Sequence, residues 1–222
     1  MLPSKQRIRP YAVGLTGGVA SGKTTLANAF TVFGIQVLSA DQISRDVLSL
    51  PAVCDRLGEL FGSAVLLPNG QANRQRLREI VFADARFRRQ LEALVHPIIR
   101  QTLEQKVAMC AGPYSITEIP LLFEAGGRSA YPWLQRIATV VTSPALQLTH
   151  LLQREAMTPE LAQRIIHAQA SNASRIRIAD DVIYNVTGSP ASLQMHAQIL
   201  HALYVRLANQ ATCLHSLRPV SD

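Results

Sequence analysis

One eight-residue segment constrains the fold of this chain more than any other. Residues 17–24 read Gly-Gly-Val-Ala-Ser-Gly-Lys-Thr and match the pattern G-x-x-x-x-G-K-[ST]. An apolar run at Tyr11–Leu15 precedes the segment and predicts a buried strand. A helical pattern follows from about Thr24 to Phe33, with Gly34 as the expected C-terminal cap. Because strand, glycine-rich turn and helix occur together, we interpret the segment as a phosphate-binding loop rather than a chance glycine-rich turn.

Each residue type in this loop has a task in holding a polyphosphate. Glycines let the backbone N–H groups point into a concave nest, and the start of the helix adds partial positive charge. Lys23 reaches the outer phosphates, and Thr24 can ligate Mg²⁺. We therefore predict a nucleoside triphosphate site. Its predicted contacts are Gly18, Val19, Ala20, Ser21, Gly22, Lys23, Thr24 and Thr25.

The rest of the chain alternates short apolar runs with helical patterns, which is typical of βαβ units and a parallel sheet. The further predicted strands are Ile35–Leu38, Tyr114–Ile119, Arg136–Thr142 and Val182–Val186. Three helices are expected to begin at Ser143-Pro144, Thr158-Pro159 and Ser189-Pro190, since each pair places a capping hydroxyl before a proline. We predict a P-loop NTPase fold of three α/β/α layers with a five-stranded parallel sheet. Between Gln42 and Met109 the sequence pattern is helical and indicates an inserted helical lobe.

Charge and composition narrow the possible partners. The 222 residues carry 22 Lys and Arg against 15 Asp and Glu, a net charge of +7, which favours an anionic partner. Aromatic residues make up only 5% and no nucleic-acid recognition motif is found, so we do not expect nucleic-acid binding. No apolar run approaches the roughly 20 residues of a membrane-spanning helix, so we expect a soluble protein without a membrane partner.

Two further features favour a cytoplasmic location. Residues 1–10 contain no apolar region typical of a secretory signal. The three cysteines, Cys54, Cys110 and Cys213, are odd in number and scattered, which fits a reducing compartment better than a disulfide framework. We expect each cysteine to be buried as a small apolar side chain.

Asp41 is the first candidate for catalysis. It follows the predicted strand Ile35–Leu38, at the sheet edge where ligands gather in open α/β folds. A carboxylate there can accept the proton of an attacking hydroxyl or hold that hydroxyl in line with the phosphoryl group. The alternative is that Asp41 caps a helix beginning at Gln42.

An ordered set of motifs resembles the dephospho-coenzyme A kinase family, over about Tyr11 to Leu207. A phosphate loop alone would leave other small-molecule or nucleotide kinases, or a non-catalytic ATP-sensing module, as alternatives. A GTPase is disfavoured because the guanine-reading Asn-Lys-x-Asp is absent. The resemblance rests on 14–18 (Gly-Leu-Thr-Gly-Gly), Ala40-Asp41, 95–97 (Val-His-Pro), 120–124 (Pro-Leu-Leu-Phe-Glu), Gln153-Arg154, Ala168-Gln169, and 179–183 (Ala-Asp-Asp-Val-Ile) with Asn185.

The resemblance implies transfer of the γ-phosphoryl group of ATP to the ribose 3′-hydroxyl of dephospho-coenzyme A, with Mg²⁺. It implies that Asp41 is the catalytic base, that Arg154 is a lid arginine approaching the ATP phosphates, and that the acceptor lies between core and lobe. One domain would then span 11–210. Its expected parts are a core (11–41, 112–143 and 179–210), a helical acceptor lobe (42–111) and a lid (144–178), with tails at 1–10 and 211–222.

Weaker candidates have plain structural alternatives. His96 precedes Pro97 at an expected helix break and is a candidate acceptor contact, or a helix-junction histidine bonded to backbone. Glu124 is a candidate acceptor residue or an exposed loop acid, and Asn185 either faces the ATP base or ends a turn. The arginines of the lobe form mostly solvated faces, of which one or two are candidates for the acceptor pyrophosphate; they are Arg74, Arg76, Arg78, Arg86, Arg88 and Arg89.

Two positions depart from the family pattern. Ser39 stands where many relatives have an acid, so it would be a weaker partner for a metal shell. Ala20 stands where glycine is common, and it costs turn freedom only if its backbone needs a positive φ.

Overall fold

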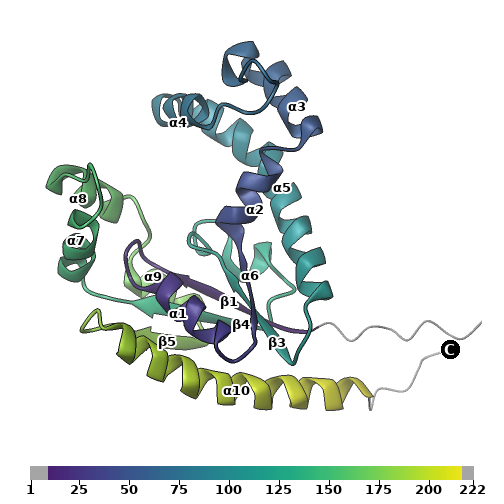
Figure 1. Ribbon diagram of the computed structural model, residues 1–222, viewed down its shortest axis with the longest axis vertical. Helices are drawn as coiled ribbons and strands as arrows, with labels where there is room; N and C mark the ends of the chain where they lie inside the picture. Colours follow the sequence, from purple (N-terminus) through teal and green to yellow (C-terminus); the bar gives the residue numbers. More distant parts are fainter. Residues whose placement is uncertain (1–9, 217–222) are drawn as a thin grey trace, which may run out of the picture. The chain divides into compact units, whose positions relative to one another are not determined.

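The computed structural model describes residues 10–216, and a five-stranded sheet organises most of them (Figure 1). The strands are β1 (Tyr11–Gly17), β2 (Gln36–Ser39), β3 (Tyr114–Glu118), β4 (Arg136–Val141) and β5 (Asp181–Tyr184). They are hydrogen-bonded in the order β2-β3-β1-β4-β5, and every pair is parallel. The predicted five-stranded parallel sheet is confirmed, with strand ends shifted by one or two residues.

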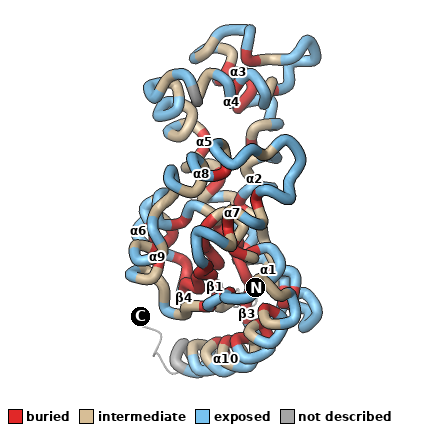
Figure 2. The backbone as a smooth tube through the Cα atoms, turned by 90° about the vertical axis from the view of Figure 1, so that its left-hand side faces the viewer, coloured by how far each residue is buried: buried red, intermediate tan, exposed pale blue. Residues whose placement is uncertain are grey.

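One face of the sheet packs against α1 (Lys23–Thr31) and the long helix α10 (Pro190–Ser216). Strand residues at alternate positions meet Leu26 and Phe30 of α1 and Leu193 and Tyr204 of α10 in one buried cluster. Alternation follows from the strand period of two, which sends successive side chains to opposite faces. Figure 2 shows buried residues around β1 and β4 and also on the helices.

The other face is covered by α9 (Asn172–Ile178) and, near Gly14, by Leu122 and Leu134, which lie on either side of α6 (Gly127–Ala130) in the chain. Gly14 of β1 lies under this layer, where an added Cβ would approach Leu134 Cδ1 to 2.7 Å. Because both faces are covered, the three α/β/α layers predicted from the sequence are confirmed.

The predicted Ser/Thr-Pro helix starts are also confirmed. Ser143 caps α7 (Pro144–Leu152) by accepting the Leu146 N–H, and Thr158 caps α8 (Pro159–His167) by accepting the Leu161 N–H. The third pair begins α10 at Pro190. These caps depend only on neighbouring residues, which is why the sequence predicts them well.

Residues 40–105 form a second compact unit of helices. Its elements are α2 (Ala40–Val47), α3 (Pro51–Phe61), a short 3₁₀ helix (Ser63–Val65), α4 (Arg74–Ala83) and most of α5 (Ala85–Met109). One isolated bridge, Leu66 with Ala72, closes the turn around Gly70.

The expected helix break at Pro97 is wrong, because Pro97 lies inside α5, a continuous helix of 25 residues. Proline removes one intrahelical hydrogen bond and disfavours a helix interior by about 3 kcal/mol. Four-residue spacing nevertheless places Val95, Ile99, Leu103 and Val107 on one buried face. Burial of that face offsets the cost of the proline, so packing decides the outcome rather than local propensity.

Three smaller expectations also change. Helix α1 ends at Thr31, and Gly34 forms a separate turn at φ 72°. Cys54 is buried and Cys110 partly so, but Cys213 is exposed on α10, so the expectation of three buried cysteines is wrong. Helix α10 also continues through residue 216, into the segment that the sequence assigned to a tail; residues 1–9 and 217–222 lie outside the described range.

Within residues 10–216, no helix combines the length and apolar character needed to cross a bilayer.

Candidate active site

The turn between β1 and α1 has the backbone shape of a phosphate-binding loop. Gly17 and Gly22 have φ of 151° and 96°. A Cβ on Gly17 would lie 2.5 Å from the Val140 carbonyl oxygen, and one on Gly22 would meet Leu193 at 2.8 Å. These two positions therefore require glycine both for conformation and for space.

Ala20 adopts φ 54°, in the left-handed region. Its backbone therefore does need a positive φ, so alanine at this position does cost turn freedom relative to glycine. A non-glycine residue in that region costs roughly 1–2 kcal/mol, so the surrounding contacts must hold the turn.

Four successive carbonyl oxygens of the loop each lie within hydrogen-bond distance of a side-chain nitrogen. The pairs are Gly18 O with Lys23 Nζ at 2.8 Å, Val19 O with Gln147 Nε2 at 2.7 Å, Ala20 O with His150 Nδ1 at 3.1 Å, and Ser21 O with Asn185 Nδ2 at 2.9 Å. Three of these donors come from α7 and the end of β5. These contacts occupy the loop carbonyls, so the N–H groups at the start of α1 are the backbone groups left to form an anion nest.

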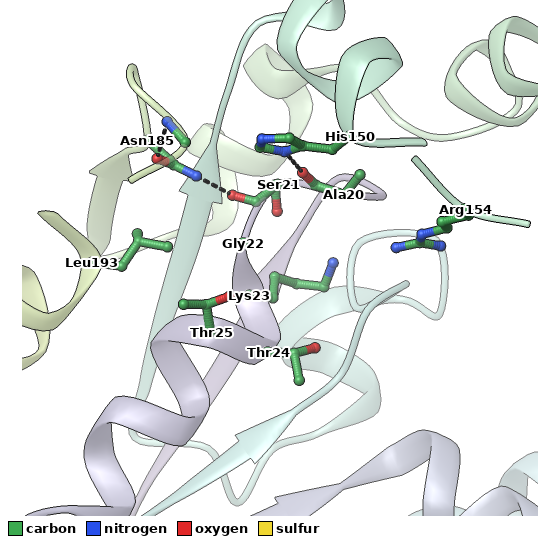
Figure 3. A pocket seen from close by; sticks show the side chains of 11 residues that line it. Ala20, Ser21, Gly22, Lys23, Thr24, Thr25, His150, Arg154, Asn185 and Leu193 are labelled. Carbon is green, nitrogen blue, oxygen red and sulfur yellow. Dashed lines mark hydrogen bonds between the residues drawn. The ribbon is translucent and has the colours of Figure 1, made fainter. Parts of the chain in front are cut away.

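The loop opens on a cavity of about 320 Å³ (Figure 3). It is lined by Ala20, Ser21, Gly22, Lys23, Thr24, Thr25, His150, Arg154, Asn185, Gly188 and Leu193. The first N–H groups of α1 open onto it, and such groups have no acceptor within their own helix. Gly18 and Val19, also predicted as contacts, are not among the lining residues.

Arg154 and Asn185 lie at opposite sides of this cavity in Figure 3. Arg154 follows α7 and is exposed, so its guanidinium can turn toward a bound anion. Asn185 is 1% exposed; its amide donates to Ser21 and its Oδ1 accepts the Gly188 N–H. This arrangement makes Asn185 a brace of the loop, while its contact with the ATP base stays a prediction.

A further candidate, not singled out from the sequence, is Glu118, the last residue of β3. Its Oε1 accepts the Thr24 hydroxyl at 2.8 Å, and the residue is only 9% exposed. Strand register places it opposite Ser39, the last residue of β2. The sequence feature that points to Glu118 is an acidic residue at the carboxyl end of a predicted buried strand, where ligands bind in open α/β sheets.

Asp41 lies in the second unit, exposed in the first turn of α2. Because α2 begins at Ala40, Asp41 does not cap a helix starting at Gln42, and that alternative is wrong. Asp41 lines a cavity of about 350 Å³ within the helical unit. The other lining residues are Ser44, Arg45, Leu48, Arg74, Leu77, Arg78, Val81 and Leu91. This cavity combines three arginines with an apolar wall.

His96 and Glu124 belong to different compact units. His96 is half-buried in α5, where burial lowers its pKa, and it does not line the cavity that holds Asp41. Glu124 Oε1 accepts the Ala170 N–H at 2.8 Å and lies 3.7 Å from Arg175 Nη2. The structure thus gives Glu124 one partner between α8 and α9 and one within α9.

Comparisons with known proteins agree with this geometry. A family model described as dephospho-CoA kinase matches residues 11–191. The dephospho-CoA kinase of Xanthomonas euvesicatoria is 47% identical over 194 residues, covering 87% of this chain and 95% of that one. The dephospho-CoA kinase of Xylella fastidiosa strain Temecula1 is 46% identical over 199 residues, covering 90% and 96%.

Solved structures show the same architecture. TT1252 from Thermus thermophilus superimposes with a TM-score of 0.75 at 28% identity, covering 88% of this chain and 98% of that one. Dephospho-CoA kinase from Campylobacter jejuni has a TM-score of 0.66 at 23% identity, covering 87% and 96%, and supports the fold. The resemblance seen in the sequence is confirmed by the family model and the curated relatives: this chain belongs to the dephospho-CoA kinase family.

Proposed function

We propose that this chain transfers the γ-phosphoryl group of ATP to the ribose 3′-hydroxyl of dephospho-coenzyme A, giving coenzyme A and ADP, the last step of coenzyme A synthesis. The observation that carries the proposal is the phosphate loop, whose carbonyls accept hydrogen bonds from side chains and which opens on a cavity lined by Lys23 and Arg154. The chain that contains this loop belongs to the dephospho-CoA kinase family.

In the proposed reaction the acceptor oxygen forms a bond to the γ-phosphorus while the bond from that phosphorus to the bridging oxygen of ADP breaks. Lys23 and the loop N–H groups hold the phosphates, and Arg154 approaches the transferring group from the α7 side. Their charge favours the negative charge that spreads over the oxygens in the transition state. The proton of the acceptor hydroxyl passes to Asp41.

Asp41 is suited to that task by its place in the chain. It stands two residues beyond Ser39, the end of β2, so the chain keeps its backbone within about 7 Å of the strand end. Its carboxylate is exposed and can receive a proton. The strand ends of an open parallel sheet are where ligands bind, which supports Asp41 as the base.

The residues present fit Mg²⁺, the metal that the family implies. Thr24 Oγ1 and Glu118 Oε1 are 2.8 Å apart and offer the hard oxygen ligands that this ion prefers. We propose that Thr24 holds the ion directly and that Glu118 orients its water shell, beside Ser39. The ion, when bound, supplies positive charge at the phosphate oxygens.

The cavity around Asp41 supports an acceptor with both anionic and apolar parts. Arg45, Arg74 and Arg78 would face its pyrophosphate, and the leucines its pantetheine arm. Arg74 is already oriented, because its Nη2 donates to the Arg45 carbonyl at 2.8 Å. Of the six lobe arginines suggested by the sequence, Arg74 and Arg78 thus remain as candidates.

The function is tested by incubating the full chain with MgATP and dephospho-coenzyme A. We expect coenzyme A, detected as a mass increase of one phosphoryl group, together with an equal amount of ADP. Adenosine and shikimate in place of the acceptor test the alternative of another small-molecule kinase. ATP-binding protein that yields no phosphorylated acceptor would instead support the sensing alternative and overturn the proposal.

Glu118→Gln is expected to raise the Mg²⁺ concentration for half-maximal activity by roughly 10- to 100-fold, because groups that orient a metal's ligands have effects of that size. The measurement is a Mg²⁺ titration at saturating ATP. Thr24→Ser is the matched control, since it keeps the hydroxyl and should stay near the wild-type value. Equal Mg²⁺ dependence of Glu118→Gln and wild type would remove Glu118 from the metal site.

A further inference from the structure

Two glutamines hold the peptide groups of Val19 from opposite sides. Gln169 Oε1 accepts the Val19 N–H at 2.7 Å, and Gln147 Nε2 donates to the Val19 carbonyl at 2.7 Å. Gln147 belongs to α7, whereas Gln169 follows α8. The residue before the strained Ala20 is therefore held by side chains about 130 and 150 positions away in the chain.

Next to Gln169 lies Arg175, a buried cation whose ion pair with Glu124 is long. Arg175 is 2% exposed; its Nη2 donates to Gln169 Oε1 at 3.3 Å and lies 3.7 Å from Glu124 Oε1. Burial lowers its pKa, and Glu124 opposes that effect. Among the described residues, no acceptor is found for its Nε. Retaining such a group costs desolvation energy, which calls for a function.

Arg175 also lies directly against the phosphate loop. A Cβ placed on Gly18 would come within 3.4 Å of Arg175 Nη1 and within 2.4 Å of Gln147 Nε2. The space beside Gly18 is thus filled by Arg175 and by Gln147, which also holds Val19. This contact places a fixed positive charge beside the loop at Gly18.

The chemistry of the groups fixes how Gln169 must be oriented. A glutamine amide can rotate by 180° and exchange its oxygen with its NH₂ group. Arginine has only donors, and the Val19 N–H is also a donor, so both require the oxygen of Gln169. Without Arg175, the Gln169 amide could rotate and turn its NH₂ group toward the Val19 N–H. Two donors would then face each other, and the partly buried Val19 N–H would lose its acceptor.

We propose that Arg175 and Gln169 are positioning residues for ATP: Arg175 orients the Gln169 amide, and Gln169 holds the Val19 peptide so that the left-handed turn at Ala20 presents its N–H edge to the phosphates. Glu124 completes the arrangement, since its contact with the Ala170 N–H fixes the residue next to Gln169. The inference gives Glu124 a positioning role in place of an acceptor contact. It rests on the proposed assignment of the loop as the ATP site.

The test compares Gln169→Met with Gln169→Glu by calorimetric titration of the full chain with MgATP. Gln169→Met keeps length but lacks an acceptor, and we expect it to weaken ATP binding about tenfold, the effect of one lost buried hydrogen bond. Gln169→Glu keeps an oxygen for both donors and should recover most of that affinity. Gln163→Met, at an exposed position of α8, is the matched control and should bind as wild type does.

Steady-state kinetics then separate positioning from general damage. For Gln169→Met we expect the KM for ATP to rise about tenfold while the KM for dephospho-coenzyme A changes less than twofold. A loss of folding would lower both together with the melting temperature. Failure of Gln169→Glu to recover affinity would contradict the proposal, because the acceptor oxygen is what the proposal requires.

Arg175→Met tests the relay from Arg175 to Gln169. Alone, Arg175→Met should weaken ATP binding about as much as Gln169→Met does. In the Gln169→Met background it should weaken ATP binding by less than a further threefold, since both changes break the same chain of contacts. Fully multiplicative effects would overturn the relay. If Arg175→Met does not fold, the two Gln169 variants still decide the role of Gln169, and Arg175→Lys, which keeps the buried charge with fewer donors, tests the relay in its place.

Lys23→Met separates this inference from the assignment of the loop. If wild type and Lys23→Met bind ATP equally, the loop assignment itself fails. If wild type binds ATP, Lys23→Met does not, and Gln169→Met binds within twofold of wild type, only the positioning inference fails.

Discussion

Asp41→Asn is expected to lower kcat by a factor of about 10²–10⁴, the usual contribution of a general base, while the affinity for MgATP stays within twofold of wild type. Asparagine has the same shape and can still accept a hydrogen bond, but it cannot take up the proton of the acceptor hydroxyl. The side chain is exposed in the first turn of α2, so the substitution should not disturb the fold.

The measurement is coenzyme A formation under saturating substrates, with ATP affinity determined separately by titration. Asp46→Asn provides a matched control in the same helix: the residue is exposed, its carboxylate accepts the Gln42 amide, and the variant should keep full turnover. Undiminished turnover in Asp41→Asn would remove Asp41 from the role of base. A parallel loss of ATP affinity would point to a role in binding instead.

The sequence predicts well those features that depend on neighbouring residues. The phosphate loop is a continuous motif, and the caps at Ser143 and Thr158 need only a hydroxyl three residues before the N–H that it accepts. Strands are short apolar runs bounded by turn residues, so five of them could be placed within one or two residues of their observed ends. The parallel sheet followed from their alternation with helices.

The features that the sequence does not predict depend on contacts between distant segments. Glu118 meets Thr24 across 94 positions, and Gln169 meets Val19 across 150. The place of Glu118 at a strand end marks it as a candidate, but no local pattern shows which distant residue either side chain meets. The continuation of α5 through Pro97 was missed for the related reason that tertiary packing of a long buried face outweighed a local helix breaker.

Ala20 shows where sequence and structure must be combined. Its departure from the family's glycine raised the question of a positive φ, and only the structure gives the value of 54°. The strain is tolerated because the preceding peptide is held by Gln147 and Gln169 and the Ala20 carbonyl faces His150. A loop that lacks the freedom of glycine thus depends more strongly on its braces.

Lys23→Met is expected to lower kcat/KM for ATP by about 10²–10³, as the loss of one well-placed charged donor to a transferring group does. The side chain is 8% exposed and its Nζ donates to the Gly18 carbonyl at 2.8 Å, so the ammonium is held at the loop before ATP binds. Methionine has nearly the same length and fills the same space without charge. Lys106→Met, at an exposed position of α5, is the control and should have wild-type kinetics.

Stability and activity should respond differently to Lys23→Met, and this difference separates a functional role from a structural one. A buried ammonium costs desolvation energy that methionine does not, and this gain offsets the loss of the hydrogen bond to Gly18. The melting temperature should therefore stay close to that of wild type while turnover falls. If the melting temperature fell as steeply as activity, Lys23 would be acting mainly on the loop's structure. A normal melting temperature with normal ATP affinity and turnover would contradict the assignment of Lys23 to the phosphates, because a charge that costs energy in the free protein is retained only if it stabilises the bound triphosphate or its transition state.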